Sequence, residues 1–181
     1  KKRKFVLEKK NKKLYLEIFK FINFFKLIEE ALEKRYHPYD EMKCPVHFAH
    51  GQECVPAALS ILIKNSDYLF SHHRSHGYYL AKKCPLDNLF AELYGKETGA
   101  NGGIAGSQDI SFEKKKFFSG AILAGGISIA VGTALSLKLR KSKNLVFCSF
   151  GESATDQGIF WESLNYSSLK NLPILFICEN N

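Results

Sequence analysis

Two short apolar runs near the end of the chain constrain its fold most. NLVFCSF covers residues 144–150 and PILFICE covers 173–179, and both have the length and composition of buried strands. A polar turn that starts at Gly151 and an expected helix at about 158–170 lie between them. Strand, helix and strand form a βαβ unit, in which the two strands run parallel. We therefore expect an α/β protein with a parallel sheet flanked by helices.

Periodic apolar residues predict three helices before this unit. Between residues 14 and 32 they recur every three or four positions, which predicts an amphipathic N-terminal helix that serves packing. The small and apolar residues at 55–63 suit a buried helix that is entered from a loop at 47–52. A further helix is expected at 86–94.

A Gly-rich stretch and an apolar stretch follow. Five glycines fall within residues 95–106, and this density indicates a loop. Residues 120–139 are apolar with small residues throughout, as in a helix packed closely on a sheet or on another subunit. A membrane-spanning helix is the alternative, but the strand, turn and helix that follow favour a βαβ unit. We therefore expect no membrane partner.

The positive charge is concentrated at the start of the chain. The formal net charge is +8, and residues 1–13 hold eight basic residues and one acidic residue, which account for +7. A basic arm binds nucleic acid in some proteins, but a solvated terminus is the commoner case. The sequence after residue 13 shows no basic stripe, so a nucleic-acid-binding domain is only a rival hypothesis. We divide the chain into an arm at 1–13 and one domain at 14–181.

Cysteine spacing and the absence of an export signal bear on location. The five cysteines are widely spaced and form no CxxC pair, which argues against zinc and against a disulfide framework. Residues 14–32 are too polar for a signal-peptide core. These features predict a cytoplasmic protein. Because the chain begins with Lys and stops at Asn181 directly after an apolar run, we expect it to be a fragment of a longer subunit.

Oxygen-bearing side chains follow both strands of the predicted βαβ unit. Ligands of open α/β sheets bind beyond the carboxyl ends of the strands. Glu152 follows the first strand and Asn181 follows the second, 29 positions later. A carboxylate and an amide oxygen are ligands that suit Mg²⁺. The backbone N–H groups of Ser153 and Ala154 could approach a phosphate bound to that cation.

The segment GESATDQGIFWESLNYSSLKNLPILFICENN resembles the thiamine diphosphate signature of 2-oxo acid dehydrogenase alpha subunits. In that signature Gly-Asp-Gly or Gly-Glu-Gly comes first and Asn-Asn comes last, at comparable spacing. The resemblance extends upstream through HFAHGQEC, FSHHRSHG, LFAELYGKETG and GAILAGGISIAVGTAL, and it covers roughly residues 14–181. It implies a thiamine diphosphate-binding fold and Mg²⁺ as the second cofactor.

The resemblance also implies a role for each matching residue. Metal ligation is implied for Glu152 and Asn181, and contact with the cofactor is implied for His47, His73, Arg74, Ala121, Leu123, Glu152, Ser153, Ala154 and Asn181. Within this set, His47, His73 and Arg74 would contact diphosphate oxygens, since a guanidinium matches phosphate in a fork. Ala121 and Leu123 would lie against the pyrimidine and thiazolium rings, although Leu123 is also well suited to an ordinary core.

Partners are implied in the same way. Related enzymes are alpha-beta heterotetramers in which a beta subunit supplies the activating glutamate, so no catalytic residue is expected on this chain. They act on pyruvate, a branched-chain 2-oxo acid or acetoin and pass the acyl group to a lipoyl-bearing acyltransferase. The apolar stretch at 120–136 is the candidate subunit interface.

Four positions depart from the family pattern. Glu152 stands where Asp is usual, Ser153 replaces the second Gly of the motif, His73 replaces Tyr, and Asp109 replaces a His. These changes leave open a non-catalytic paralogue that serves as a scaffold or regulatory subunit. The histidines around Arg74 raise zinc as another alternative, but no carboxylate or thiolate lies near them in the sequence.

Overall fold

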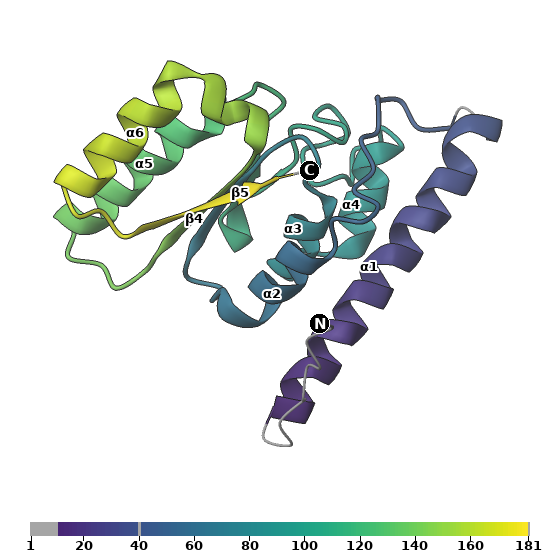
Figure 1. Ribbon diagram of the computed structural model, residues 1–181. Helices are drawn as coiled ribbons and strands as arrows, with labels where there is room; N and C mark the ends of the chain where they lie inside the picture. Colours follow the sequence, from purple (N-terminus) through teal and green to yellow (C-terminus); the bar gives the residue numbers. More distant parts are fainter. Residues whose placement is uncertain (1–10, 40, 181) are drawn as a thin grey trace.

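A computed structural model describes residues 11–39 and 41–180, and its centre is a five-stranded sheet (Figure 1). The strands lie in the order β2-β3-β1-β4-β5. Their bounds are Tyr68–Ser71 for β1, Ser111–Phe112 for β2, Phe117–Ser119 for β3, Val146–Gly151 for β4 and Ile174–Glu179 for β5. Every described pair is parallel except β2 with β3. The expected α/β class with a parallel sheet is therefore confirmed.

The predicted βαβ unit consists of β4, α6 (Gly158–Leu169) and β5. β4 and β5 are parallel neighbours, and their register runs from the pair Val146 and Ile174 to the pair Gly151 and Glu179. A short 3₁₀ helix, η3 (Glu152–Asp156), occupies the turn after β4. The carboxyl ends of both strands consequently meet at one edge of the sheet.

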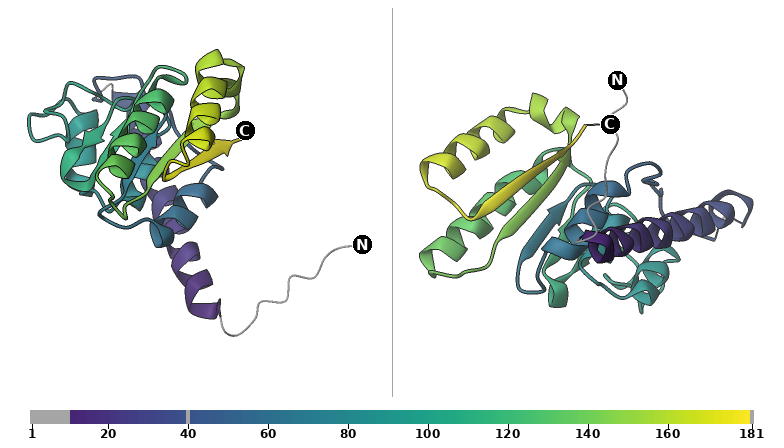
Figure 2. Two further views of the ribbon diagram at one scale, coloured as in Figure 1. Left: turned by 90° about the vertical axis from the view of Figure 1, so that its left-hand side faces the viewer. Right: turned by 60° about the horizontal axis from the view of Figure 1, so that its bottom comes forward.

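Alternate side chains of the strands enter two separate apolar cores. Leu69 and Phe147 belong to the core shared with α1 to α4, whereas Phe70 and Cys148 belong to the core shared with α5 and α6. This alternation follows from the two-residue period of a strand. Figures 1 and 2 show the result, with α5 and α6 on one face of the sheet and α1 to α4 on the other.

The remaining helices agree largely with the predicted ones. Their bounds are Lys12–Tyr39 for α1, Cys54–Leu62 for α2, His76–Ala81 for α3, Leu86–Leu93 for α4 and Gly125–Leu139 for α5, with a 3₁₀ helix η2 at Glu113–Lys115. The helices expected at 55–63 and 86–94 are confirmed as α2 and α4. β1, β3 and α3 were not predicted, because elements of three to six residues are too short to show a period.

The N-terminal helix α1 is longer than its apolar period suggested. It has 28 residues and buries Phe25, Ile28 and Leu32 against the helical core. Lys12 and Lys13 from the expected basic arm belong to this helix. Residues 1–10 of that arm lie outside the described part of the chain.

α5 begins five residues later than the apolar stretch suggested. Residues 120–124 form a loop instead, in which Ala124 has a φ of 60°. The Asp109 carboxylate accepts a hydrogen bond from the backbone N–H of Ala121 at 2.9 Å, which holds this loop away from helical geometry. Among the described residues, no helix combines the length and apolarity that crossing a membrane requires.

The expected Gly-rich loop is built around one buried carboxylate. Glu92, in α4, is 1% exposed and accepts hydrogen bonds at 2.7 to 3.1 Å. The donors are the backbone N–H groups of Asn101, Gly103, Ala105 and Gly106. These four bonds give the buried Glu92 carboxylate hydrogen-bond donors and give four backbone N–H groups of an irregular loop an acceptor.

Candidate functional site

A polar pocket lies at the carboxyl ends of the parallel strands. β1 ends at Ser71, β4 at Gly151 and β5 at Glu179, and the three strands are neighbours. The pocket has a volume of about 280 Å³. Its lining residues are Gln52, His72, His73, Arg74, Leu123, Gly151, Glu152, Ser153 and Glu179. The structure thus brings together five residues that the sequence analysis placed in one site: His73, Arg74, Leu123, Glu152 and Ser153.

Arg74 is the cationic side chain of this pocket. It follows β1, and its guanidinium donates a hydrogen bond to the backbone carbonyl of Phe48. Its backbone N–H also lies 3.3 Å from Nδ1 of His72. A guanidinium carries five N–H donors in a fixed fork, so one bond to a carbonyl leaves further donors for an anionic ligand.

Three histidine rings gather beside Arg74. The ring centroid of His73 lies 5.1 Å from that of His47 and 5.5 Å from that of His72. Burial lowers the pKa of His73, and the neighbouring charges of His72, His47 and Arg74 lower it further. His47 does not line the polar pocket, but its ring contacts that of His73, which does.

His72 and Glu179 form a pair that the sequence analysis did not predict. Nε2 of His72 lies 2.7 Å from a carboxylate oxygen of Glu179, and the two side chains are 10% and 8% exposed. The ring of Tyr78 lies edge-on to that of His72, with centroids 5.8 Å apart, and burial followed by the charge of Glu179 raises the pKa of Tyr78. The Tyr78, Ser71 and Ser149 hydroxyls are buried and have no hydrogen-bond partner within the described residues.

Glu152 and Ser153 begin the turn after β4. The Ser153 hydroxyl donates a hydrogen bond to the Glu152 carboxylate at 3.1 Å, and the Thr155 hydroxyl donates one to the Glu152 backbone carbonyl at 2.6 Å. Ser153 is not among the described residues with positive φ, so the backbone here does not require the glycine of the family motif. Ala154 is buried in the core under the turn.

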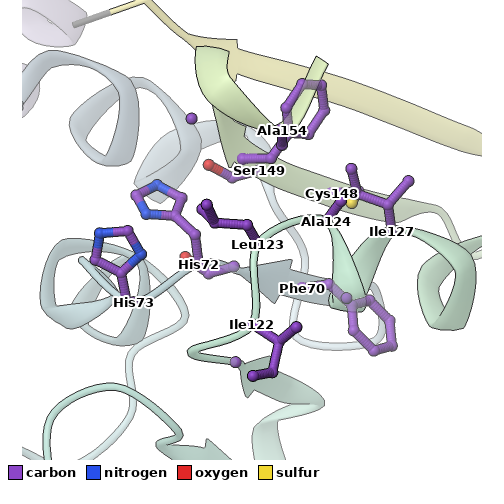
Figure 3. A pocket seen from close by; sticks show the side chains of 15 residues that line it. Phe70, His72, His73, Ile122, Leu123, Ala124, Ile127, Cys148, Ser149 and Ala154 are labelled. Atoms are coloured by element: carbon purple, nitrogen blue, oxygen red, sulfur yellow. The ribbon is translucent and has the colours of Figure 1, made fainter. Parts of the chain in front are cut away.

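A second, mostly apolar cavity lies beside the loop before α5. It has a volume of about 470 Å³, and its lining includes Asp109, Phe118, Ala121, Ile122 and Ile129. A narrow cavity of about 20 Å³ shares lining residues with both larger spaces. Figure 3 shows this narrow cavity, with His72 and His73 on one side and Phe70 on the other.

The predicted residues thus divide along an elongated site. Ala121 lies at the apolar end, Ala154 borders the narrow cavity, and Leu123, which is 51% exposed, lies between the polar pocket and the narrow cavity. Asn181 lies outside the described residues, so its predicted metal contact stays a prediction. Within residues 11–39 and 41–180, no group of three or more His, Cys, Asp or Glu side chains is arranged to hold a metal ion.

An open, mostly parallel sheet with a pocket beyond its carboxyl edge defines the class of α/β ligand-binding domains. Within this class, the chain belongs to the dehydrogenase E1 component family, whose model matches residues 26–181. The family predicted from the sequence motifs is therefore confirmed.

Two curated relatives show the range of this family. The alpha subunit of acetoin:2,6-dichlorophenolindophenol oxidoreductase from Bacillus subtilis (strain 168) is 39% identical over 137 residues, which are 75% of this chain and 41% of that protein. The pyruvate dehydrogenase E1 component subunit alpha from Porphyra purpurea is 39% identical over 144 residues, which are 75% of this chain and 42% of that protein. The chain spans about two fifths of the length of these relatives.

Similarity to solved structures is weaker. A chain described as a candidate thiamin diphosphate-dependent enzyme from Mycobacterium smegmatis has a TM-score of 0.45 and 16% sequence identity. The match covers 70% of this chain and 20% of that chain. A likeness of this size carries no weight for function.

Proposed function

We propose that this chain belongs to the alpha subunit of a thiamine diphosphate-dependent enzyme that acts on a 2-oxo acid or on acetoin. The observation that carries the proposal is the elongated site in a member of the dehydrogenase E1 component family. One end of it holds Arg74 and His73, and the other end is apolar. A cofactor with an anionic diphosphate at one end and two aromatic rings at the other matches this division of charge.

The residues at the polar end fit a diphosphate. Arg74 contributes a permanent positive charge with several donors, and His47 and His73 add ring nitrogens close by. Burial and, after it, neighbouring positive charge lower the pKa of His73, and a bound anion would offset that positive charge. The backbone N–H groups of Ser153 and Ala154 are our further candidates for contact with phosphate oxygens.

Magnesium is the second part of the proposal. Glu152 lines the polar pocket, and we propose that it and Asn181 hold the cation together with the diphosphate. Mg²⁺ keeps several waters and usually takes one or two protein carboxylates plus phosphate oxygens. No three His, Cys, Asp or Glu side chains of the described residues are arranged to hold a metal ion, so we propose that Mg²⁺ binds here together with the cofactor diphosphate.

The chain's own residues would bind and orient, and the cofactor would supply the reactive carbon. Thiamine diphosphate, when bound, provides a nucleophilic thiazolium carbon and an electron sink for cleavage beside a carbonyl. We propose that Ala121, which lines the apolar cavity, and Leu123, which borders the polar pocket and the narrow cavity, support its rings. The low polarity of that end would also limit access of water.

Partners and location belong to the proposal as well. We propose a beta subunit that supplies the activating glutamate in an alpha-beta heterotetramer, and a lipoyl-bearing acyltransferase that receives the acyl group. The stretch 120–136 is our candidate interface, since Ile122 and Ile129 there are 78% and 61% exposed. All five cysteines are free thiols in the structure, which suits the reducing cytoplasm that we propose.

The test is a titration of thiamine diphosphate into the full-length alpha subunit co-expressed with its beta subunit, with and without Mg²⁺. Glu152→Ala and Asn181→Ala are expected to abolish the Mg²⁺-dependent part of binding. Turnover of pyruvate, branched-chain 2-oxo acids and acetoin would then identify the substrate. A wild-type complex that binds no cofactor would overturn the proposal and favour a non-catalytic paralogue.

A further inference from the structure

One peptide unit joins the cationic end of the site to the N-terminal helix. The backbone carbonyl of Phe48 accepts the hydrogen bond from the Arg74 guanidinium. The N–H of the same peptide, which belongs to Ala49, donates to a carboxylate oxygen of Glu29 at 2.8 Å. A trans peptide is planar, and its N–H and C=O point in opposite directions. Capture of the N–H by Glu29 therefore directs the carbonyl toward Arg74.

The same carboxylate also fixes the helix that follows Arg74. The second oxygen of Glu29 lies 2.7 Å from Nδ1 of His76, the first residue of α3. Nε2 of His76 lies 2.9 Å from the hydroxyl of Ser107 at the end of the Gly-rich loop. Glu29 in α1 thus holds both the anchor of Arg74 and the start of α3, two residues beyond Arg74.

Glu29, His76 and Ser107 are linked in the order acid, histidine and hydroxyl of a nucleophilic triad. They are not accessible to a substrate. Ser107 and Glu29 are each 1% exposed, and His76 is 0% exposed. A nucleophile must reach the reacting atom, and a hydroxyl enclosed in this way does not. The arrangement therefore serves to position other groups.

We propose that Glu29 is a positioning residue for Arg74 and so for recognition of the cofactor diphosphate. This inference rests on the function proposed above. It makes α1, which packs with α2 to α4 on one side of the sheet (Figure 1) and contributes no residue to the lining of the polar pocket, part of the anion-binding machinery. The alternative is that Glu29 only anchors α1. In that case the effect of replacing Glu29 would be the same whether or not Arg74 is present.

A double-mutant cycle separates these two roles. Thiamine diphosphate with Mg²⁺ is titrated into the full-length alpha subunit in complex with its beta subunit. The variants are Glu29→Met, which removes both acceptor oxygens, Arg74→Ala, and the two together. Glu29→Met is expected to weaken binding about tenfold in the wild-type background and less than about twofold in the Arg74→Ala background, as for residues that act as a unit.

Two further variants keep the test informative. Glu29→Gln keeps one oxygen for the Ala49 N–H, and its amide can donate to His76 after a change of tautomer, so near-normal affinity is expected. Should Glu29→Met fail to fold, Glu29→Asp takes its place, because a shorter side chain draws the carboxylate away from the peptide. Glu30→Gln is the matched control, since Glu30 makes only a partly exposed pair with Lys26 at 3.9 Å.

Hydrogen exchange of the Ala49 amide gives a readout that does not depend on the cofactor. Faster exchange is expected in Glu29→Met and not in Glu29→Gln. Equal losses of affinity in both backgrounds, or no loss with Glu29→Met, would overturn the inference and leave the proposed function intact. A wild-type complex that does not bind thiamine diphosphate would overturn the proposed function and the inference with it.

Discussion

Nε2 of His72 lies 2.7 Å from the Glu179 carboxylate, and this contact joins the end of β1 to the end of β5 across β4. Both side chains are nearly buried, and both line the polar pocket. The pair therefore closes one wall of the site and fixes the spacing of strands whose carboxyl ends carry the predicted ligands.

Removal of this contact is expected to destabilise the protein. His72→Leu leaves the Glu179 carboxylate nearly buried without its partner, which costs about 1–3 kcal/mol of the free energy of unfolding. Urea denaturation followed by circular dichroism measures the change. His50→Leu is the control, because the side chains of the His50 and Glu33 pair are 38% and 54% exposed and its loss is expected to cost less than about 1 kcal/mol. Equal losses in the two variants would contradict the prediction.

The pKa of His73 predicts how stability depends on pH. Burial, followed by nearby positive charge, lowers it below the ordinary value of 6.5, so below that pH the unfolded chain binds more protons than the folded one. The free energy of unfolding should therefore decrease as pH falls from 6.5 through the folded pKa. Denaturation at pH 7 and pH 5 should show a smaller decrease in His73→Asn than in the wild type. A decrease of the same size in both would show that His73 does not carry this effect.

Two neighbouring glycines provide a matched test of the Gly-rich loop. Gly102 and Gly103 both have positive φ, at 70° and 79°, so alanine is strained at either position. A Cβ at Gly102 meets nothing within 4 Å, whereas one at Gly103 would lie 2.5 Å from the backbone carbon of Gly95. Gly102→Ala should cost about 1 kcal/mol, and Gly103→Ala should cost at least about 3 kcal/mol. Thermal unfolding measures both losses of stability, and equal losses in the two variants would contradict the prediction.

Asp109 is expected to matter through the loop that it holds. Asp109→Ala removes the acceptor for the Ala121 N–H and frees the loop at 120–124, whose first three residues line the apolar cavity. We expect faster hydrogen exchange at Ala121 and about threefold to tenfold weaker binding of thiamine diphosphate, as for loss of one ordering hydrogen bond. Asp109→Asn keeps an oxygen acceptor and should behave like the wild type. Unchanged exchange in Asp109→Ala would refute this role.

The local sequence was sufficient for the longer elements. Apolar periodicity and flanking turns were enough to predict α2, α4, α6, β4 and β5, because the local sequence of each element favours its structure. The start of α5 did not follow in this way. Residues 120–124 have helical composition, but the Asp109 carboxylate, which is 12 positions away from Ala121, binds the loop.

The same division holds for the site. Glu152 and Ser153 were predicted because they follow an expected strand, and His73 and Arg74 were predicted through the family resemblance of the segment FSHHRSHG. All four residues line the polar pocket, and their roles there stay predictions. The partnership of His72 with Glu179 spans 107 positions, and no local pattern encodes it.

The sequence by itself determined the fold class, the family and the residue types at the carboxyl edge of the sheet, because these depend on periods and motifs within short segments. Only the tertiary structure decided which of these residues share a pocket and which buried carboxylates hold them. Glu29 shows the reason most clearly. It is an ordinary acidic residue in an amphipathic helix until folding removes it from water, and a buried carboxylate then requires the N–H groups that distant segments supply.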